Sequence, residues 1–331
     1  MNYRNYSQLS SLIKKSIHSI KKNNYDLIVG IPRSGMVPAY MIALYLNLNC
    51  CDIEDLIYNR KLKSGSTRKI GKTIKYPNEA NRILLVDDSI HSGKSLQNTL
   101  NKIPKNIKMK ITTFAIYSSE KKRDDIDYFL EYLPIPRVFE WNIFHHKIIE
   151  RACFNVDGVL CADTSLTEND RGKRHGRFML NSNPLIIPSK KINTLISSRP
   201  EKYRKETEEW LYKNEIEYET LIMLNLPSKK ENIELGRVHA TYKARIYKNS
   251  QMDLFFESDR RQAIKIHEIT KKPVYCVTTN ELFSKRNLRS FLNSSNRTKK
   301  HIMVKLLRKL PVPIYGIIKF ISQKIIAIKR S

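Results

Sequence analysis

The chain has 331 residues, enough for two domains of ordinary size, and its hydrophobic (41%) and charged (28%) fractions are those of a soluble globular protein. Sixty lysines and arginines against 32 aspartates and glutamates give a formal net charge of +28, which predicts anionic partners such as polyphosphates or an anionic membrane surface. No stretch reaches the roughly eighteen apolar residues of a membrane span. The five cysteines form no CxxC pair, which favours reduced thiols in a cytoplasmic protein.

The first elements that the pattern predicts are a helix over Tyr6–Lys21, a strand over Asp26–Val29 and a helix over Met36–Leu46. A loop with a glycine at each end joins the strand to the second helix. Its glycines permit close backbone approach to a ligand, and its arginine supplies charge for a phosphate. The residues of this loop are Gly30, Ile31, Pro32, Arg33, Ser34 and Gly35.

The stretch Ile83–Leu96 carries the strongest motif. Four apolar residues, Ile83 to Val86, predict a strand buried on both faces, and Asp87 and Asp88 follow at its carboxyl end, where open α/β sheets bind ligands. A short turn then opens a helix, and its N–H groups and hydroxyls can surround a phosphate. The turn contains Ser92, Gly93, Lys94 and Ser95. Paired carboxylates can bind vicinal hydroxyls. With a phosphate site beside them, they predict a sugar phosphate as the ligand.

This stretch, with the Gly30–Gly35 loop one βα unit earlier, resembles the type I phosphoribosyltransferases, which bind phosphoribosyl pyrophosphate (PRPP). The resemblance implies that Asp87 and Asp88 hold the ribose hydroxyls, that the turn Ser92–Ser95 binds the 5-phosphate, and that the earlier loop binds pyrophosphate. Ser89 is a further candidate for PRPP binding. His91 stands where the family often has an aspartate, which in nucleobase enzymes handles a proton. It is a candidate base for a different acceptor, or a neutral hydrogen-bonding group.

A basic segment, Tyr58–Arg82, separates the two motifs. It is either a solvated surface loop or the lid that the resemblance implies, closing over PRPP and screening pyrophosphate. The candidate cations are Arg60, Lys61, Lys63, Arg68 and Lys72. Farther on, Ile111–Tyr117 predicts another buried strand. The aromatic stretch Phe129–Phe144 predicts a hood over the sugar site, although ordinary packing is the preferred interpretation of Trp141.

A second domain is expected from residue 148. Asn155-Val156-Asp157-Gly158 follows an apolar strand and resembles the first motif of haloacid dehalogenase superfamily phosphatases, Asp-x-Asp-Gly. There the first Asp is the nucleophile and a Mg²⁺ ligand, and the second is the general acid and base. Asn155 occupies the nucleophile position, and an amide cannot act as that anion. The alternatives are a degraded phosphatase, a deliberate Asp to Asn change, or another mechanism.

The other motifs of that superfamily follow in order. Ser197 matches the hydroxyl that bonds the phosphoryl group, and Lys243, with Lys248 as the alternative, matches the cation of the third motif. Glu257 and Asp259 form a strand-end carboxylate pair suited to Mg²⁺. The catalytic set implied for this domain is therefore Asn155, Asp157, Ser197 and Lys243, and the metal set is Asn155, Asp157, Glu257 and Asp259.

The segment Lys285–Ser331 has thirteen Lys or Arg and no Asp or Glu. Its apolar residues repeat at helical spacing with the basic ones opposite, which predicts an amphipathic helix on anionic lipid, or else a basic tail folded on the second domain. Few aromatic residues accompany the charges, so nucleic acid is not the expected partner.

We expect an α/β protein with two doubly wound, mainly parallel-sheet domains, 1–147 and 148–284, followed by the tail 285–331. The combination resembles bifunctional ribofuranosyltransferases of bacterial capsule and O-antigen synthesis. It implies Mg²⁺-dependent transfer of 5-phosphoribose to a sugar hydroxyl of a lipid-linked glycan, then 5-phosphate removal, at the inner face of the plasma membrane. The alternatives are a salvage phosphoribosyltransferase with a phosphatase domain and a non-catalytic PRPP-sensing protein.

Overall fold

The computed structural model describes residues 1–63, 74–162, 180–224 and 235–284. The chain divides into two compact units. Unit 1 comprises residues 1–150 and 186–191, and unit 2 comprises the described residues of 151–185 and from 192 onward. Residues 186–191 thus belong to unit 1, whereas the expected boundary between 147 and 148 places them in the second domain. The expected tail, 285–331, lies outside the described residues.

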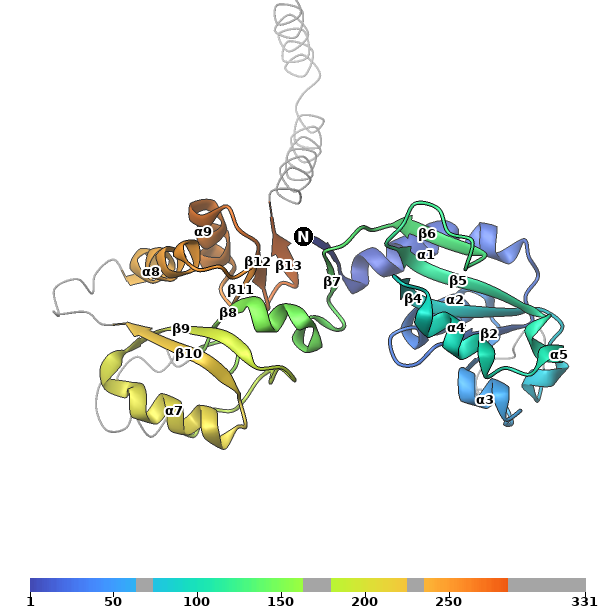
Figure 1. Ribbon diagram of the computed structural model, residues 1–331, viewed down its shortest axis with the longest axis horizontal. Coiled ribbons are helices and arrows are strands. Elements are labelled where there is room, and N and C mark those ends of the chain that lie inside the picture. The colour runs from blue at the N-terminus through green and yellow to red at the C-terminus, as the bar shows by residue number, and fades with distance from the viewer. Residues whose placement is uncertain (64–73, 163–179, 225–234, 285–331) are drawn as a thin grey trace, which may run out of the picture. The chain divides into compact units, whose positions relative to one another are not determined.

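Unit 1 contains a five-stranded parallel sheet of order β3-β2-β4-β5-β6 and a separate parallel pair, β1 with β7 (Figure 1). Its strands are β1 (Asn2–Arg4), β2 (Leu27–Gly30), β3 (Asn49–Asp52), β4 (Ile83–Ile90), β5 (Ile111–Ser118), β6 (Tyr128–Tyr132) and β7 (Arg137–Phe139). Its α-helices are α1 (Tyr6–Lys21), α2 (Met36–Leu46), α3 (Ile53–Ile57), α4 (Lys94–Asn101) and α5 (Lys105–Lys108), and short 3-10 turns are η1 (Pro77–Glu79), η2 (Ile143–His145) and η3 (Lys147–Arg151).

The apolar runs of the central strands arise because both faces of this sheet are covered. Leu27, Val29, Ile83 and Leu85 pack with residues of α3, α4 and α5. The alternate residues Ile28, Leu84 and Val86 pack with α1 and α2 on the other face. Successive strand side chains point to opposite faces, so a strand between two helical layers is apolar at every position.

The predicted bounds of α1 and α2 are confirmed, whereas β4 is longer than predicted. The strand does not end before the acidic pair but continues to Ile90. Register with β5 explains the difference, because Asp87 pairs with Ala115, Ser89 with Tyr117 and Ile90 with Ser118. Both aspartates therefore sit within the sheet rather than in a loop after it.

Unit 2 contains a six-stranded sheet of order β10-β9-β8-β11-β12-β13, parallel except for β13. Its strands are β8 (Ala152–Asn155), β9 (Ile192–Pro200), β10 (Tyr218–Leu224), β11 (Leu254–Glu257), β12 (Val274–Cys276) and β13 (Glu281–Phe283). Its helices are the 3-10 turn η5 (Glu201–Tyr203), α7 (Arg204–Lys213), α8 (Leu235–Asn249) and α9 (Arg260–Thr270). Both units are thus mixed α/β structures with mainly parallel sheets, as expected.

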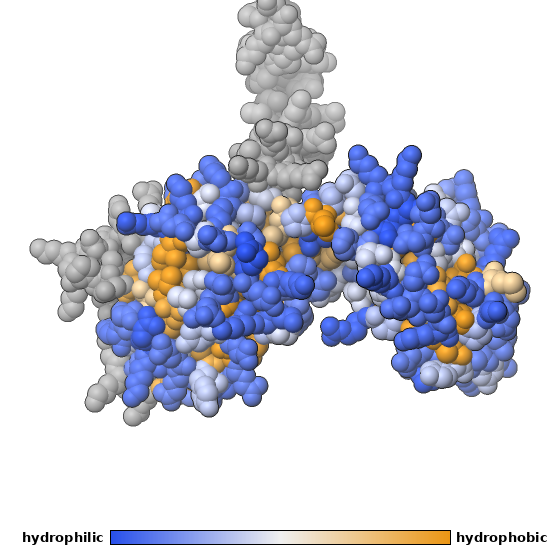
Figure 2. Space-filling model, viewed as in Figure 1, coloured by the Kyte–Doolittle hydropathy of each residue, from blue (hydrophilic) through white to orange (hydrophobic). Residues whose placement is uncertain are grey.

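The core of unit 2 packs α8 and α9 against one face of its sheet, and Figure 1 shows α7 on the other side. Ala244 and Tyr247 of α8 meet Phe255 of β11 and Ile266 of α9 in one cluster of buried residues. All five cysteines are free thiols. Figure 2 shows a mostly hydrophilic surface interrupted by smaller hydrophobic areas. Within the described ranges, no helix is both long enough and apolar enough to span a bilayer.

Candidate active site

The loop that follows β2 lies directly against β4, which carries the acidic pair. The Ile31 N–H donates to the Val86 carbonyl over 2.9 Å. A Cβ atom on Gly35 would stand 2.6 Å from the Ile31 carbonyl oxygen and 2.8 Å from that of Val86, so only glycine fits there. The contact places the predicted pyrophosphate loop at the carboxyl end of β2 and next to the middle of β4, where the acidic pair begins.

Asp88 is the buried member of the acidic pair, with 4% of its surface exposed. Its carboxylate accepts a hydrogen bond from the Ser34 hydroxyl (2.9 Å) and one from the indole Nε1–H of Trp141 (2.6 Å). Trp141 itself stacks on Phe139, with 4.8 Å between ring centroids. The sequence predicts ordinary packing for Trp141, and its ring does pack. The hydrogen bond from its indole N–H to the Asp88 carboxylate was not predicted.

Asp87 accepts the backbone N–H of Asp88 (2.8 Å), and its pKa is raised to about 8. Burial is the largest cause, and the neighbouring charge of Asp88 is the second. The protonated form of Asp87 is therefore favoured beside the Asp88 carboxylate. Such a pair is suited to receive hydroxyl donors or a cation.

The turn after β4 is shaped by Gly93, whose φ of +74° places it in the left-handed region at the start of α4. Arg123 holds this turn by donating to the His91 carbonyl, while Asp125 accepts both Nε–H and Nη2–H of the same guanidinium at 2.7 Å. The turn side chains Ser92, Lys94 and Ser95 are exposed. An exposed, backbone-anchored turn at a helix start can receive an anion.

His91 is exposed beside that turn, and its Nδ1 lies 3.0 Å from the Ser119 hydroxyl. Ser89, two residues before it, is half-buried within β4. In the loop after β2, Pro32 and Arg33 are exposed and Ser34 is half-buried. The structure thus brings the Gly30–Gly35 loop and the acidic pair together, with the Gly93 turn next along the chain.

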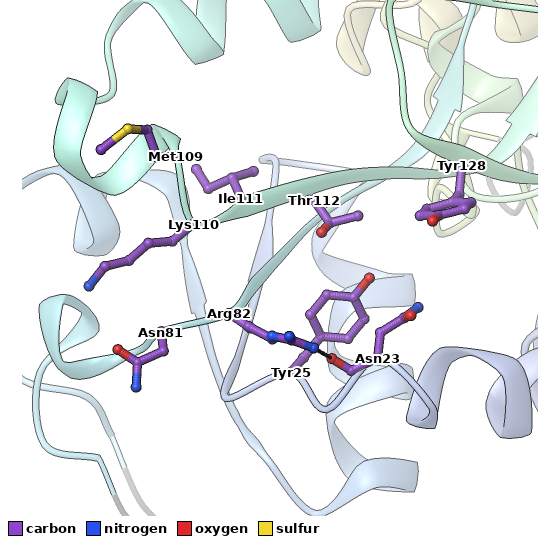
Figure 3. Close-up of a pocket in the computed structure, with 9 residues that line it drawn as sticks. All are labelled: Asn23, Tyr25, Asn81, Arg82, Met109, Lys110, Ile111, Thr112 and Tyr128. Atoms are coloured by element: carbon purple, nitrogen blue, oxygen red, sulfur yellow. Dashed lines mark hydrogen bonds between the residues drawn. The ribbon is translucent and has the colours of Figure 1, made fainter.

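A surface cavity of about 320 Å³ in unit 1 lies at the opposite edge of the sheet (Figure 3). Its lining comes from residues at or just before the amino ends of strands, such as Tyr25 before β2, Arg82 before β4 and Thr112 in β5. Arg82 donates to the Asn23 carbonyl across it (3.0 Å). None of the predicted site residues lines this cavity, which is therefore distinct from the candidate site.

Residues 3–148 match the family model described as the phosphoribosyl transferase domain. Unit 1 is a phosphoribosyltransferase domain. PRPP is the typical substrate of this domain family, and the match supports a transferase.

The solved structures similar to this chain include a purine phosphoribosyltransferase from Pyrococcus horikoshii Ot3 (20% identity, TM-score 0.31, covering 42% of this chain and 92% of that one). A xanthine-guanine-hypoxanthine phosphoribosyltransferase of Helicobacter pylori has 17% identity and a TM-score of 0.32, with coverage of 43% and 93%. A hypothetical protein from Neisseria gonorrhoeae with bound ppGpp has 15% identity and a TM-score of 0.30, with coverage of 43% and 88%. No curated protein matches the chain.

The predicted lid of the phosphoribosyltransferase domain is described only in part. Arg60 pairs with Asp55 (3.5 Å) and Glu54 (3.7 Å), both from α3, and Lys61 and Lys63 are exposed. Arg68 and Lys72 lie outside the described residues. No single cation of this segment is thereby assigned to pyrophosphate.

Unit 2 holds a second polar cluster where β8, β9 and β11 end. The Asn155 amide donates to the Asp157 carbonyl (2.8 Å) and to Oε1 of Glu257 (3.1 Å), and Lys243 donates to Oε2 of Glu257 (2.5 Å). Gly158, with φ of +74°, lets this turn approach Ser258, since a Cβ would stand 2.3 Å from the Ser258 hydroxyl. Lys248 is exposed, so the cation that reaches the cluster is Lys243.

Arg199 and His239 are residues of this cluster to which the sequence analysis gave no role. The Arg199 Nη2–H donates to Asp157 (2.7 Å), and its Nε–H lies within 3.1 Å of both carboxylate oxygens. Arg199 is two residues after Ser197 in β9, so both side chains face one side, and this spacing was the available signal. His239 lies one turn before Lys243 on α8, and burial followed by the Lys243 charge lowers its pKa.

The four predicted metal ligands do not all lie together. Asn155, Asp157 and Glu257 lie together, whereas Asp259 is exposed and caps α9 by accepting the Gln262 N–H (2.7 Å). Ser197 is fully buried and accepts the Arg199 N–H (3.1 Å). In the described ranges, no three His, Cys, Asp or Glu side chains form a group that could hold a metal ion.

Proposed function

We propose that this chain transfers the 5-phosphoribosyl group of PRPP to a sugar hydroxyl of a bacterial surface glycan. The supporting observation is the Asp87–Asp88 pair, held against the Gly30–Gly35 loop in a phosphoribosyltransferase domain. The bond between C1 of the ribose and the pyrophosphate oxygen breaks, and pyrophosphate leaves with the electron pair. The acceptor oxygen bonds C1 from the opposite face, which converts the α-configured donor into a β-ribofuranoside.

The acidic pair would act on the ribose ring. Asp87 and Asp88 accept hydrogen bonds from its 2- and 3-hydroxyls, while Ser34 and Trp141 fix the Asp88 carboxylate. Negative charge close to the ring favours the oxocarbenium-like transition state, which carries developing positive charge. Holding the hydroxyls also orients C1 toward the acceptor, and this positioning supplies much of the rate.

Phosphoribosyltransferases typically use Mg²⁺, which would offset the negative charge of the leaving pyrophosphate. Among the described residues, unit 1 offers such an ion the two carboxylates of Asp87 and Asp88 and no larger group of metal ligands, so the ion would be carried in with the substrate. Either acid can accept a hydrogen bond from a ribose hydroxyl or face that cation.

A sugar hydroxyl as acceptor is supported by His91. The side chain is exposed next to the Gly93 turn, and Ser119 orients its ring through Nδ1. The other ring nitrogen can face an acceptor hydroxyl and take its proton as the C1–O bond forms. His91→Ala should slow transfer to the acceptor while leaving PRPP affinity unchanged, and equal turnover of both chains would remove His91 from the reaction.

Unit 2 is proposed to be a haloacid dehalogenase-like domain that acts on the 5-phosphate of the transferred group. Its support is the clustering of Asn155, Asp157, Lys243 and Glu257 at the carboxyl ends of parallel strands. Asn155 lacks the anionic oxygen of a nucleophile, so removal of the 5-phosphate is assigned only to a form with aspartate at this position. The chain as written would leave 5-phosphoribose on its product.

The acceptor is proposed to be a lipid-linked glycan at the inner face of the plasma membrane. The support for this place is the basic segment Lys285–Ser331, whose charges favour anionic lipid by about 1 kcal/mol each near the surface. Deleting 285–331 should reduce binding to vesicles that contain anionic lipid. Unchanged vesicle binding would contradict this location.

The central experiment incubates the protein with PRPP labelled in the ribose, Mg²⁺ and candidate lipid-linked or synthetic glycan acceptors. Label should enter the glycan with release of pyrophosphate. Asp87→Asn with Asp88→Asn should abolish both. The matched control, Asp124→Asn with Glu150→Gln, removes two exposed acids of the same unit and should leave both rates unchanged. Label that enters a nucleoside instead would overturn the proposal.

A further inference from the structure

The amide of Asn155 joins two oxygen atoms that belong to different strand ends. Its nitrogen lies 2.8 Å from the Asp157 carbonyl oxygen and 3.1 Å from Glu257 Oε1. The two oxygens thus converge on a single point, and an –NH₂ group with two protons can donate to both. In a divalent metal site these same two kinds of oxygen, a carbonyl and a carboxylate, would bind the cation.

The oxygens of Glu257 already have donors. Oε1 also accepts the Ser258 N–H (2.9 Å), and Oε2 accepts the Lys243 ammonium (2.5 Å). Glu257 is fully buried and Lys243 is 2% exposed. A cation at this place would have to displace donors from a carboxylate that is satisfied without it.

Among the residues that the structure describes, the charges of the cluster also balance without a metal. Lys243 is paired with Glu257, and Arg199 is paired with Asp157 over 2.7 Å. The side chains of these two cations are each 2% exposed. The two positive and two negative charges sum to zero, and Asn155 adds none. A divalent cation would leave two positive charges uncompensated in a site with little solvent.

We propose that the Asn155 amide takes the place of a divalent cation in unit 2, so that the hydrogen bonds of this site are complete without metal. The residues of unit 2 do not fit the Mg²⁺ that its resemblance implies. Asp259, expected to be a ligand, caps α9 instead. The inference concerns unit 2 alone and does not rest on the ribosyl transfer proposed for unit 1.

Asn155→Asp reverses this arrangement. It exchanges two N–H donors for a carboxylate oxygen that faces the Asp157 carbonyl and the Glu257 carboxylate. Three oxygens then converge with nothing between them, which is unfavourable in a buried site unless a cation enters. The stability of the variant should therefore depend on a divalent ion, whereas the stability of the chain with Asn155 should not.

The test is a Mn²⁺ titration followed by electron paramagnetic resonance of the free ion, made on full-length protein. Asp87→Asn with Asp88→Asn serves as the background, so that binding in unit 1 does not contribute. With Asn155 present, no Mn²⁺ should bind in unit 2. Binding that disappears on Glu257→Gln would place the ion in this cluster and overturn the proposal, whether or not the Asn155→Asp variant folds.

Adding Asn155→Asp to that background should create about one new Mn²⁺ site per chain. Its melting temperature in chelator should fall by about 5 °C or more and recover with Mg²⁺. Asn155→Ala is the matched control, since it removes the amide donors without adding charge. It should be destabilised equally with Mg²⁺ and with chelator. Recovery of the alanine variant by Mg²⁺ would show that the ion needs no oxygen at position 155, contrary to the proposal.

Discussion

The indole N–H of Trp141 donates to the carboxylate of Asp88 over 2.6 Å, and this bond connects an aromatic cluster to the acidic pair of the phosphoribosyltransferase domain. The ring stacks on Phe139 and lies 6.4 Å, centroid to centroid, from Tyr117. Asp88 is thus held by a side chain that is itself fixed by packing. Under the proposed function, a ribose hydroxyl would meet a carboxylate that is already oriented.

Trp141→Phe keeps the stacked ring but removes the donor to Asp88. We expect kcat/KM for PRPP, measured by pyrophosphate release, to fall about tenfold, since one hydrogen bond to a charged group contributes about 1.5 kcal/mol. Trp210→Phe is the matched control, because the Trp210 indole donates to the Ser182 carbonyl in unit 2 (2.7 Å). It should destabilise unit 2 without changing pyrophosphate release. Equal losses in both variants would contradict the role of Trp141.

The raised pKa of Asp87 predicts a pH dependence of stability. Well below pH 4 the carboxyl is protonated in folded and unfolded chains alike, so it contributes nothing to the difference. As pH rises toward about 8, the unfolded chain loses this proton while the folded chain retains it, and the free energy of unfolding decreases. Above the folded pKa the destabilisation is complete.

Asp87→Asn removes this effect. The variant should be more stable than the parent by about 2 kcal/mol at pH 8.5 and similar to it well below pH 4, a difference smaller than the full pKa shift because solvent and neighbours relax. Urea unfolding of both chains at several pH values measures it. A difference that stays constant with pH would show that Asp87 titrates as an ordinary carboxyl.

Gly35→Ala should damage the loop against β4. Its Cβ would meet two backbone oxygens, at 2.6 and 2.8 Å, and backbone cannot rotate away as a side chain can. We expect a loss of about 2 kcal/mol or more in the stability of unit 1 and loss of PRPP binding in calorimetry. The neighbouring change Ser34→Ala removes only the bond to Asp88 and should cost less in both measurements. A larger loss for Ser34→Ala than for Gly35→Ala would argue against close packing at Gly35.

Arg199→Lys should weaken unit 2 and leave unit 1 intact. A lysine cannot reproduce the two-point contact with Asp157, so a largely buried carboxylate loses donors, at an expected cost of about 2 to 4 kcal/mol. Thermal unfolding should show an earlier transition for unit 2, with pyrophosphate release unaffected. Arg151→Lys changes an exposed pair with Asp253 and should shift no transition. Loss of pyrophosphate release in Arg199→Lys would show that the two units are coupled.

The central elements of unit 1 and the order of the polar motifs could be predicted from the amino-acid pattern. The predicted helices Tyr6–Lys21 and Met36–Leu46 have these bounds in the structure, and the apolar run Ile83–Val86 lies in a strand covered on both faces. These predictions succeeded because side-chain periodicity and glycine placement are local properties of the chain. The continuation of β4 through Asp87 and Asp88 was missed because it depends on pairing with β5.

The contacts between distant groups could not be predicted in this way, because they depend on how the strands and loops pack. Trp141 and Asp88 are 53 residues apart, Arg199 and Asp157 are 42 apart, and Glu257 and Asn155 are 102 apart. Each pair is joined by neighbouring strands or loops that pack together, and no local pattern encodes such a contact. The sequence identified Asn155 as an altered residue. Its contacts explain why an amide suits this position, since its nitrogen donates to two oxygens that would otherwise face each other.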